Sequence, residues 1–213
     1  MSDKGRLYVV ATPIGNLKDF TFRAIDTLKE VDFVFAEDTR NSIQLMKHYN
    51  IETKIDSYHE HNSVKKTPKI INLLNEGNNI ALISDAGTPT ISDPGYKLIR
   101  ACIDEKIDIV PIPGASAVTT ALSASGLPSD SFFFLGFLPH KKGRKKKISF
   151  LKSLDNTIII FESPHRLLKT LKELHDELGE RPIVVARELT KLYEEIARGN
   201  FESVIEYFES KKV

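Results

Sequence analysis

The sequence predicts an α/β protein whose first half is built on a mainly parallel sheet. Short apolar runs typical of buried strands alternate with segments of helical periodicity, which is the pattern of a parallel sheet covered on both faces. Most of these runs lead into loops rich in Gly, Pro, Ser, Thr or Asp. Because open α/β sheets bind ligands beyond the carboxyl ends of their strands, we expect the functional site in these loops.

The elements of the first half follow in order along the chain. Helix periodicity is clearest where Ala24, Ile25 and Leu28 share one face, whereas Pro68 argues against the third of the expected helices. A change of pattern after Pro113 predicts a domain boundary, giving an N-terminal domain over 1–113 and a C-terminal domain over 114–213. We expect strands over 6–11, 32–36, 80–83 and 106–112, and helices over 22–30, 39–48, 64–75 and 96–105.

The second half begins with a segment of small residues and continues as a further α/β pattern. The small residues over 115–125 predict a closely packed helix that ends at Gly126-Leu-Pro128. The other expected elements are strands over 131–135, 157–161 and 182–186, and a helix over 165–178.

Composition places the chain among ordinary folded proteins. Of its 213 residues, 41% are apolar and 28% are charged. No apolar run approaches the roughly 20 residues that a membrane-spanning helix needs, and no signal peptide precedes the first strand. The single cysteine, Cys102, lies in an apolar helical pattern and is expected to be buried rather than reactive. We therefore expect a cytoplasmic protein without a membrane partner.

Positive charge is concentrated in one segment although the formal net charge is only +1. Lys141–Lys147 places six positive side chains within seven residues. Such a block is either a solvated loop that runs into an exposed helix face or an arm that binds anions. The sequence of this segment does not decide between the two.

The loop Ser84–Gly95 (SDAGTPTISDPG) carries the richest signal for ligand binding. Gly87 and Gly95 permit positive φ angles, and Pro89 and Pro94 stiffen the path between them. The loop either wraps a small polar ligand or forms a surface turn in which Asp93 caps the next helix. The chain contains neither a Walker loop nor the glycine fingerprint of dinucleotide-binding enzymes.

Charged clusters follow several other strands. Glu37–Arg40 (EDTR) stands where a strand meets a helix, and Asp38 or Thr39 could simply cap that helix. Tyr58–Asn62 (YHEHN) adds two histidines, but H-x-H alone is a weak metal signal. In the second half, Phe161–Arg166 (FESPHR) and Arg187–Lys191 (RELTK) also follow strands directly.

Taken together and in order, these segments resemble the ribosomal RNA small-subunit methyltransferase I family, the cytidine 2′-O-methyltransferases of the tetrapyrrole methylase superfamily. The resemblance covers almost the whole chain. It rests on LYVVATPIGNL from Leu7, AEDTR from Ala36, the loop Ser84–Gly95, PGASA from Pro113, SGL from Ser125, GFLP from Gly136, ESPHR from Glu162 and RELTK from Arg187.

The resemblance implies two α/β domains that enclose S-adenosylmethionine in the cleft between them, usually within a homodimer. It implies no metal. The expected catalytic residues are Glu37, Asp38 and His59. One of them is expected to act as the base that deprotonates the ribose hydroxyl. The expected cofactor-binding residues are Pro13, Asp85, Gly87, Thr88, Ile91, Ser92, Ser116, Ala117, Phe161 and Arg187. The expected RNA-binding residues are Arg40, Lys141, Lys142, Arg144, Lys145 and Lys191.

The implied partner is small-subunit ribosomal RNA or the assembled small ribosomal subunit. Members of the family usually continue beyond the position of Val213 with further strands and a helical tail, so we expect the second domain to lack those strands. Three other hypotheses stay open at this point: a methyltransferase of the same fold that acts on a tetrapyrrole or other small molecule, a non-catalytic RNA-binding module, and a metal enzyme that uses His59 and His61.

Overall fold

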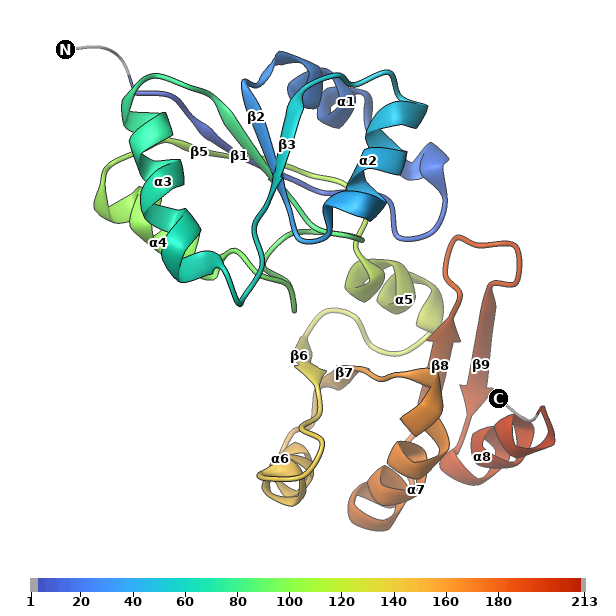
Figure 1. Cartoon of the computed structure of the whole chain (residues 1–213). Coiled ribbons are helices and arrows are strands. Elements are labelled where there is room, and N and C mark those ends of the chain that lie inside the picture. The colour runs from blue at the N-terminus through green and yellow to red at the C-terminus, as the bar shows by residue number, and fades with distance from the viewer. Residues whose placement is uncertain (1–3, 212–213) are drawn as a thin grey trace. The chain divides into compact units, whose positions relative to one another are not determined.

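A computed structural model describes residues 4–211 and divides the chain into two compact units, 1–116 and 117–213 (Figure 1). Each unit is described by itself below. In the part of the chain that the structure describes, no helix is both long and apolar enough to cross a membrane.

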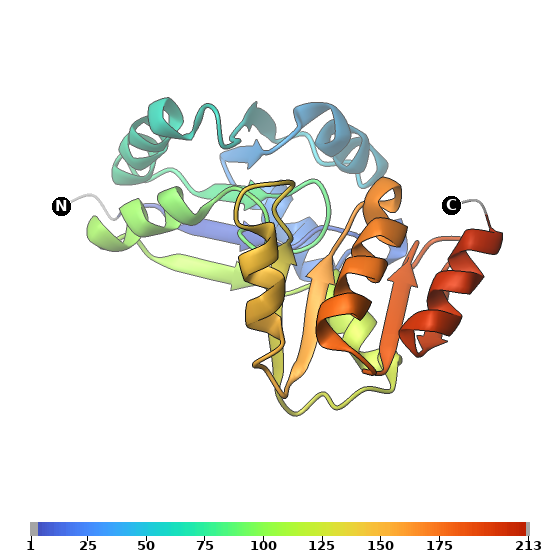
Figure 2. The same ribbon diagram turned by 90° about the horizontal axis from the view of Figure 1, so that it is seen from below.

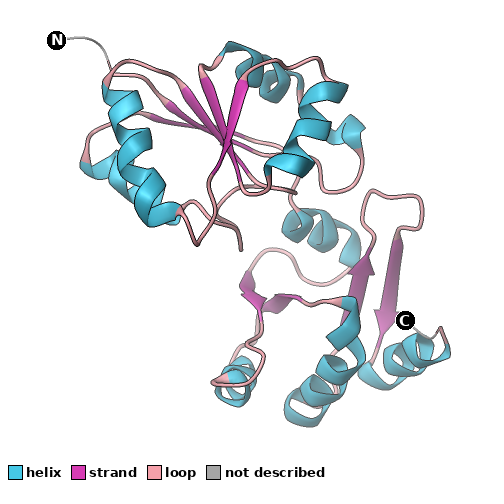
Figure 3. Ribbon diagram, viewed as in Figure 1, coloured by secondary structure: helices cyan, strands magenta, loops and turns pink. Residues whose placement is uncertain are grey.

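The first unit is built on a five-stranded sheet in which every strand pair is parallel. The strands are β1 (Leu7–Val10), β2 (Phe33–Ala36), β3 (Lys54–Ser57), β4 (Ile80–Ile83) and β5 (Ile109–Ile112), and their order across the sheet is β3-β2-β4-β1-β5. All four residues of β4 are buried, as expected of an IALI run in the centre of the sheet. The predicted α/β class with a parallel sheet is confirmed (Figures 1 and 3).

Four helices cover the two faces of this sheet. Helices α1 (Phe22–Glu30) and α2 (Thr39–His48) bury Ala24, Leu28 and Met46 in one core cluster. Helices α3 (Ser63–Asn75) and α4 (Tyr96–Asp104) bury their apolar sides in a second cluster on the other face (Figure 1). A short 3₁₀ helix, Leu17–Asp19, follows the first strand end. These helices bury both faces of the sheet and leave its strand ends free for function.

Two features of the first unit depart from the sequence pattern. Helix α3 runs through Pro68, although this residue cannot donate the bond that the Val64 carbonyl would receive in a regular helix. Full burial of Ile70 and Leu74 offsets that loss. Strand β3 was not predicted because its sequence, KIDS, is polar and lies at the sheet edge.

The single thiol behaves as expected. Cys102 is completely buried among the side chains between α3, α4 and the sheet, and burial raises the pKa of its thiol to about 11. Only the thiolate is an effective nucleophile, so a thiol with this pKa is inert at neutral pH.

The second unit contains two separate two-stranded sheets. Strands β6 (Phe132–Phe137) and β7 (Thr157–Phe161) are parallel, with an irregularity between Phe134 and Gly136. Strands β8 (Ile183–Arg187) and β9 (Glu195–Gly199) are antiparallel. The described part of the unit also contains helices α5 (Ala117–Ser125), α6 (Arg144–Leu151), α7 (Leu167–Leu178) and α8 (Phe201–Ser210), and a short 3₁₀ helix, Pro164–Arg166, directly before α7 (Figure 2).

The core of the second unit contains an element that the sequence reading missed. Phe201, Val204 and Phe208 of α8 are buried together with Leu171 and Leu174 of α7. The spacing of the three α8 residues, i, i+3 and i+7, is the helical period, so the signal for α8 was present in the sequence. Strand β9, EIARG, offers no comparable apolar run.

Candidate active site

The ends of β1 and β4 are locked together by hydrogen bonds. Thr12 and Gly87 exchange two backbone hydrogen bonds, with N···O distances of 2.9 and 3.0 Å. The Thr12 hydroxyl also donates to the carbonyl of Ser84 at 3.0 Å, and both of these side chains are buried. These contacts fix the start of the loop 84–95 against the residues that follow β1.

The rest of the loop 84–95 is held in a strained conformation. Thr90 and Ser92 have φ angles of 75° and 66°, which side-chain-bearing residues rarely adopt. Gly95 has a φ of 142°, and a Cβ placed there would lie 2.7 Å from the Thr90 Cγ2 atom. Strain of this kind persists where the surrounding structure imposes it, and it concentrates at ligand sites.

The alternative role of Asp93 as a helix cap is not observed. Gly95 precedes α4, and no side chain of that cap position bonds to the helix. Asp93 is half-buried instead, and its burial raises the pKa of its carboxyl against the opposing effect of a hydrogen bond with Ser84. The interpretation of this loop as a turn in which Asp93 caps α4 therefore does not fit the structure.

Most of the expected cofactor residues of the first unit gather at the carboxyl ends of three strands. The Thr88 hydroxyl donates to the carbonyl of Ala115 at 3.3 Å, which joins the loop 84–95 to the segment that follows β5. Ile91 is exposed on this loop. The residues brought to these three strand ends are Pro13 after β1, Asp85, Gly87, Thr88, Ile91 and Ser92 after β4, and Ser116 after β5.

The three expected catalytic residues line one pocket of about 440 Å³. Glu37 and Asp38 follow β2, and His59 follows β3. Asp85, from the end of β4, and Arg40, from α2, complete the charged lining. Because β3, β2 and β4 are neighbours in the sheet, their carboxyl ends bring together residues that are far apart in the sequence.

The two adjacent carboxylates of this pocket differ in their acidity. Asp38 caps α2 by accepting from the Arg40 N–H, and its carboxylate is also held by the Arg40 guanidinium at 2.6 to 3.2 Å. Side-chain hydrogen bonds from Arg40 lower the pKa of Asp38 to about 2. Burial raises the pKa of Glu37, and the negative charges of Asp93, Asp85 and Asp38 raise it further. Glu37 is thus the stronger base of the pair.

In the YHEHN segment, Tyr58 and Asn62 support the local structure, whereas His59 lines the pocket. Tyr58 is buried and its hydroxyl lies 3.0 Å from the Thr67 hydroxyl. The Asn62 side chain accepts from the His59 N–H at 2.9 Å and so shapes the turn. His59 lines the pocket, and its Nδ1 is buried without a hydrogen-bond partner in the structure.

His61 is exposed, and it does not share a metal-ligand group with His59. Among the described residues, the side chains close enough to hold a metal ion in a set of three are those of His175, Glu180 and Glu202. These three belong to the second unit and lie in none of the predicted motifs.

Asn41 is a member of the site that the sequence reading missed. Its side-chain amide donates to Asp85 Oδ2 at 3.0 Å, and the Asp38 N–H donates to Asp85 Oδ1 at 3.0 Å. Asp85 therefore ties the loop after β4 to the start of α2. One signal in the sequence could have pointed to this residue, because Asn41 directly follows the EDTR motif.

The expected functional residues of the second unit have partners within that unit. The Phe161 ring packs edge-on against Phe134 and Phe137, with centroids 5.0 and 5.5 Å apart. The Arg187 guanidinium donates to Glu195 at 2.6 Å, and Lys191 pairs with Glu188 at 3.1 Å. Ala117 begins α5.

Arg144, which was expected to bind RNA, is held by partners within the second unit. Its side chain is buried and donates to Glu173 at 2.7 Å and to the Thr170 hydroxyl at 2.6 Å. It also lies 3.8 Å from Glu162. A guanidinium with these partners acts as a structural anchor, because reaching a phosphate would break its buried hydrogen bonds to Glu173 and Thr170. The lysines on either side of it are exposed.

Glu162 and Arg166 belong to the same buried network rather than to a set of free charges. Two Arg166 nitrogens donate to the Glu162 carboxylate at 2.8 Å, and Thr170 donates to it at 2.7 Å. Burial alone would raise the pKa of Glu162, but these hydrogen bonds outweigh it and lower the pKa. Glu162, in the loop after β7, and Arg166, at the end of the 3₁₀ helix Pro164–Arg166, are brought together by the tight turn between them.

Fold and site together define the class of the protein. The family model described as Tetrapyrrole (Corrin/Porphyrin) Methylases matches residues 6–205, and the chain belongs to this family. The chain is therefore a methyltransferase, and the family resemblance found in its motifs is confirmed.

Its relatives include proteins named Ribosomal RNA small subunit methyltransferase I. The one from Halalkalibacterium halodurans is 54% identical over 206 residues, which are 96% of this chain and 71% of the relative. The one from Bacillus subtilis is 55% identical over 96% of this chain and 70% of the relative. The one from Thermotoga maritima is 47% identical over 98% of this chain and 94% of the relative.

Solved structures support the fold at much lower sequence identity. A cobalt precorrin-4 methyltransferase of cobalamin biosynthesis is 17% identical, with a TM-score of 0.70 over 98% of this chain and 90% of that chain. A diphthine synthase is 14% identical, with a TM-score of 0.74 over 95% of this chain and 84% of that chain. At these identities the likeness extends to the fold alone.

Methylases of this family take their methyl group from S-adenosylmethionine, and this is the cofactor of the chain. The first unit fits such a ligand on its own geometry. The loop 84–95 offers small residues, backbone groups and hydroxyls at the ends of β1, β4 and β5, and it is braced by Thr12 and Ala115. Its positive φ angles at Thr90 and Ser92 hold a shape that suits ligand binding better than a plain turn.

Proposed function

We propose that the chain methylates small-subunit ribosomal RNA, and that the acceptor is the ribose 2′-hydroxyl of a cytidine. The observation that carries this proposal is the pocket in which Glu37, a carboxyl with a raised pKa, lies beside Arg40 and His59. A weakly acidic hydroxyl needs such a base, and an RNA needs a cation near its phosphate. The names of the relatives support ribosomal RNA as the substrate class.

The bound cofactor supplies an electrophilic methyl group to the acceptor oxygen. Pro13, Asp85, Gly87, Thr88, Ile91, Ser92 and Ser116 hold it from the first unit in this proposal, largely through backbone groups. Ala117, Phe161 and Arg187 enclose it from the second unit. The task of these residues is orientation, because holding the reacting groups in line supplies several kcal/mol of the barrier reduction (about 7–11 kcal/mol in well-oriented model reactions).

Glu37 is the preferred base among the three catalytic candidates. Asp38 has its carboxylate occupied by Arg40 and a pKa of about 2, so it accepts a proton poorly at neutral pH. Among the described contacts no cation pairs with Glu37, and burial and like charges raise its pKa above the ordinary glutamate value. His59, with a buried Nδ1 that lacks a partner, is the group best placed to share the proton or to hold the ribose.

RNA binding is assigned to exposed cations. Lys141, Lys142 and Lys145 are exposed on the basic segment, and Lys191 is exposed beyond β8. Arg40, whose side chain is 87% exposed, keeps donor groups free while it pairs with Asp38. Phosphate contacts of this kind give affinity without sequence preference, so the choice of nucleotide falls to the pocket that receives an unstacked base.

The proposal also includes that the protein forms a homodimer and is located in the cytoplasm, as the resemblance implies. A ribosomal substrate agrees with a cytoplasmic location. The mass of the protein in solution tests the homodimer directly, and a monomer at working concentrations would remove it from the proposal.

The test is methyl transfer from labelled S-adenosylmethionine to small ribosomal subunits that lack their natural modifications. Naked small-subunit RNA serves as the second substrate. Label recovered as 2′-O-methylcytidine supports the cofactor, the substrate and the reaction together. Label in another nucleotide or position overturns the cytidine 2′-O assignment. Cofactor binding without transfer to RNA would favour a small-molecule substrate or a non-catalytic RNA-binding role.

A further inference from the structure

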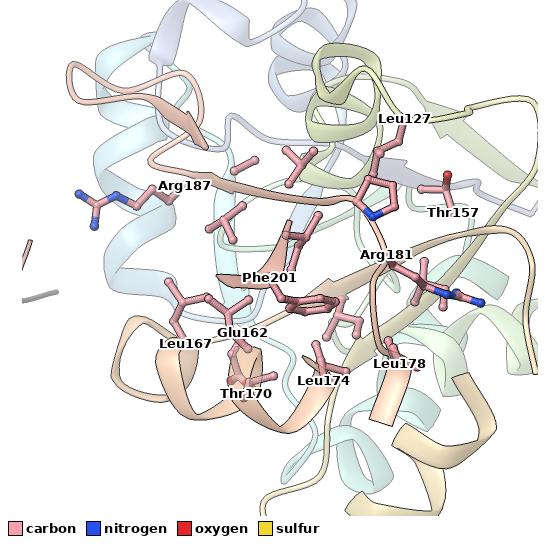
Figure 4. A pocket seen from close by; sticks show the side chains of 18 of the residues that line it. Leu127, Thr157, Glu162, Leu167, Thr170, Leu174, Leu178, Arg181, Arg187 and Phe201 are labelled. Carbon is pink, nitrogen blue, oxygen red and sulfur yellow. The ribbon is translucent and has the colours of Figure 1, made fainter. Parts of the chain in front are cut away.

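The end of helix α7 and the start of helix α8 pack against each other through two rings. The His175 ring is stacked on the Phe201 ring, with centroids 5.4 Å apart and an angle of 11° between the ring planes. Phe201 is buried and belongs to the same core cluster as Leu174 of α7, beside which it lies in Figure 4. Because one face of the imidazole rests on a buried ring, its edge, which carries both nitrogens, is held between the two helices.

Two carboxylates meet His175 at this point of the surface. Helix α7 is followed by Gly179, whose φ of 66° is typical of the residue that ends a helix. The turn brings Glu180 back to the last turn of α7, where its Oε1 atom lies 3.5 Å from His175 Nε2. Glu202 lies in the first turn of α8, next to Phe201. The three side chains place one nitrogen and two oxygens within 4.8 Å of one another.

These three residues, His175, Glu180 and Glu202, form what we call the α7–α8 cluster. Both glutamates are exposed, and among the described residues neither forms a salt bridge with a lysine or an arginine. The ion pair between His175 and Glu180 exists only when the imidazole is protonated. A neutral imidazole instead offers a lone pair beside two carboxylates. A bound cation would accept that lone pair and compensate both negative charges.

The donor atoms of the cluster indicate which cation fits. Zn²⁺ takes histidine nitrogen and carboxylate oxygen at about 2.0–2.2 Å, and tetrahedral sites with three protein ligands keep one position open. Two ligand atoms of such an ion lie about 3.3–3.5 Å apart, which the 3.5 Å between His175 and Glu180 already matches. Glu202 is exposed, so its side chain can rotate to close the remaining distance. Mg²⁺ and Ca²⁺ prefer oxygen ligands alone, so the imidazole favours zinc.

We propose that the α7–α8 cluster binds one Zn²⁺ ion, which links the end of α7 to the start of α8. Both helices supply side chains to the core of the second unit. An ion that binds the folded chain and not the unfolded one therefore stabilises this unit. The cluster lies in none of the sequence motifs and outside the pocket of Glu37, so this inference does not depend on the proposed function.

Calorimetric titration with zinc chloride tests the proposal on protein first stripped of metal with EDTA. We expect one ion per chain. His175→Gln and Glu202→Gln should each weaken binding at least tenfold, because each removes one ligand. Two matched controls should bind zinc as the unaltered protein does. Asp176→Asn changes an exposed carboxylate next to His175, and His165→Gln changes an exposed histidine of the same unit, both outside the cluster.

Thermal unfolding gives a second readout that does not rely on heats of binding. Zinc at a hundredfold excess over its Kd should raise the Tm of the unaltered protein by about 5–10 °C. The same zinc concentration should leave the Tm of Glu202→Gln unchanged. Because Glu202 is exposed, this variant keeps the fold, and its Tm without metal should equal that of the unaltered protein.

Four results would each overturn the proposal. Titration without measurable binding would remove the site, and binding that survives both ligand variants would place the ion elsewhere. Loss of binding in His61→Gln, with His175→Gln unaffected, would assign the ion to the YHEHN segment. Magnesium that displaces zinc at equal concentration would show that the imidazole is not a ligand.

Discussion

The carboxylate of Asp85 holds the backbone of Asp38 in place: the Asp38 N–H donates to Asp85 Oδ1 at 3.0 Å, across 47 positions of sequence. The second oxygen of the same carboxylate accepts from Asn41 at 3.0 Å. One side chain at the end of β4 thereby holds both Asp38 and Asn41, which lie on either side of Thr39 and Arg40. The proposed base, Glu37, directly precedes Asp38, so the position of Glu37 depends on these hydrogen bonds to Asp85.

Replacing Asn41 by alanine should therefore lower kcat for RNA methylation by about tenfold while the binding of S-adenosylmethionine changes little. The reason is the loss of one hydrogen bond to a carboxylate, which is worth about 1.5–3 kcal/mol at most and less at an exposed position. Gln44→Ala, an exposed change on the same helix, is the matched control and should leave kcat unchanged. A fall in thermal stability equal for both variants, with kcat preserved, would contradict the positioning role.

Glu37→Gln should lower kcat by about 10²- to 10⁴-fold, the usual contribution of a general base. The pKa of Glu37 is raised, chiefly by burial, and the base acts when ionised. The rate of the unaltered protein should therefore rise with pH through a pKa above the ordinary glutamate range, and the variant should lose this rise. Glu30→Gln, at an exposed position on α1, is the control. A pH–rate profile that is the same in the Glu37 variant would transfer the role to His59.

The basic segment contains two neighbouring cations with opposite expected effects. Arg144→Met should destabilise the fold by about 3 kcal/mol, because it removes the buried guanidinium that bonds to Glu173 and Thr170. Lys145→Met should leave stability unchanged and weaken RNA binding, with the slope of log K against log salt reduced by about 0.7–0.9. Urea unfolding and RNA titration at several salt concentrations measure the two effects. Equal changes in salt slope for both variants would support Arg144 as an RNA contact and contradict its purely structural role.

Low pH should destabilise the fold of the second unit, because Glu195 becomes protonated. Hydrogen bonds from Lys211, then Tyr207 and Arg187, lower the pKa of Glu195 to about 2. The folded state thus favours the ionised carboxyl, and this stabilisation is complete above the ordinary glutamate pKa of about 4.3. It is lost as pH falls from there toward about 2. Thermal unfolding between pH 6 and pH 2 should show a shallower loss of stability for Glu195→Gln, and Glu206→Gln should behave as the unaltered chain does.

The shape of the loop 84–95 should depend on Gly95. A methyl group at this position would lie 2.7 Å from Thr90 Cγ2 and 3.0 Å from Leu82 Cδ2. Gly95→Ala should therefore cost about 1–3 kcal/mol and weaken cofactor binding. Gly126→Ala is the matched control, because Gly126 also has a positive φ but faces open space. Calorimetry of cofactor binding separates the two variants, and equal affinities would show that the loop tolerates a shift at Gly95.

Much of the first unit could be predicted from the sequence because its strands and helices carry strong local signals. The boundaries of α1, α2 and β4 were predicted to the residue, since apolar periodicity and capping residues define them. Strand β3 could not be found in this way, because a polar edge strand lacks an apolar pattern. Helix α8 had its pattern in the sequence and was overlooked.

The candidate site was predicted as a set of loops, and its assembly depended on topology. The motifs at Glu37, His59 and Asp85 are separated by more than twenty residues each, and only the strand order β3-β2-β4 brings them to one pocket. Asn41 escaped prediction because its importance lies in a contact with Asp85 that no spacing rule reveals.

The sequence by itself determined the parallel α/β class, the rigid loop 84–95 and the membership in a methylase family, because apolar runs, glycines and prolines act locally. Only the tertiary structure decided how the charges are used. Arg144 and Lys145 are neighbours in one basic run, yet one is buried against Glu173 and the other is exposed. Asp38 and Glu37 are adjacent carboxylates whose pKa values shift in opposite directions. Burial and the distance to an opposite charge set these differences, and both are properties of the folded chain.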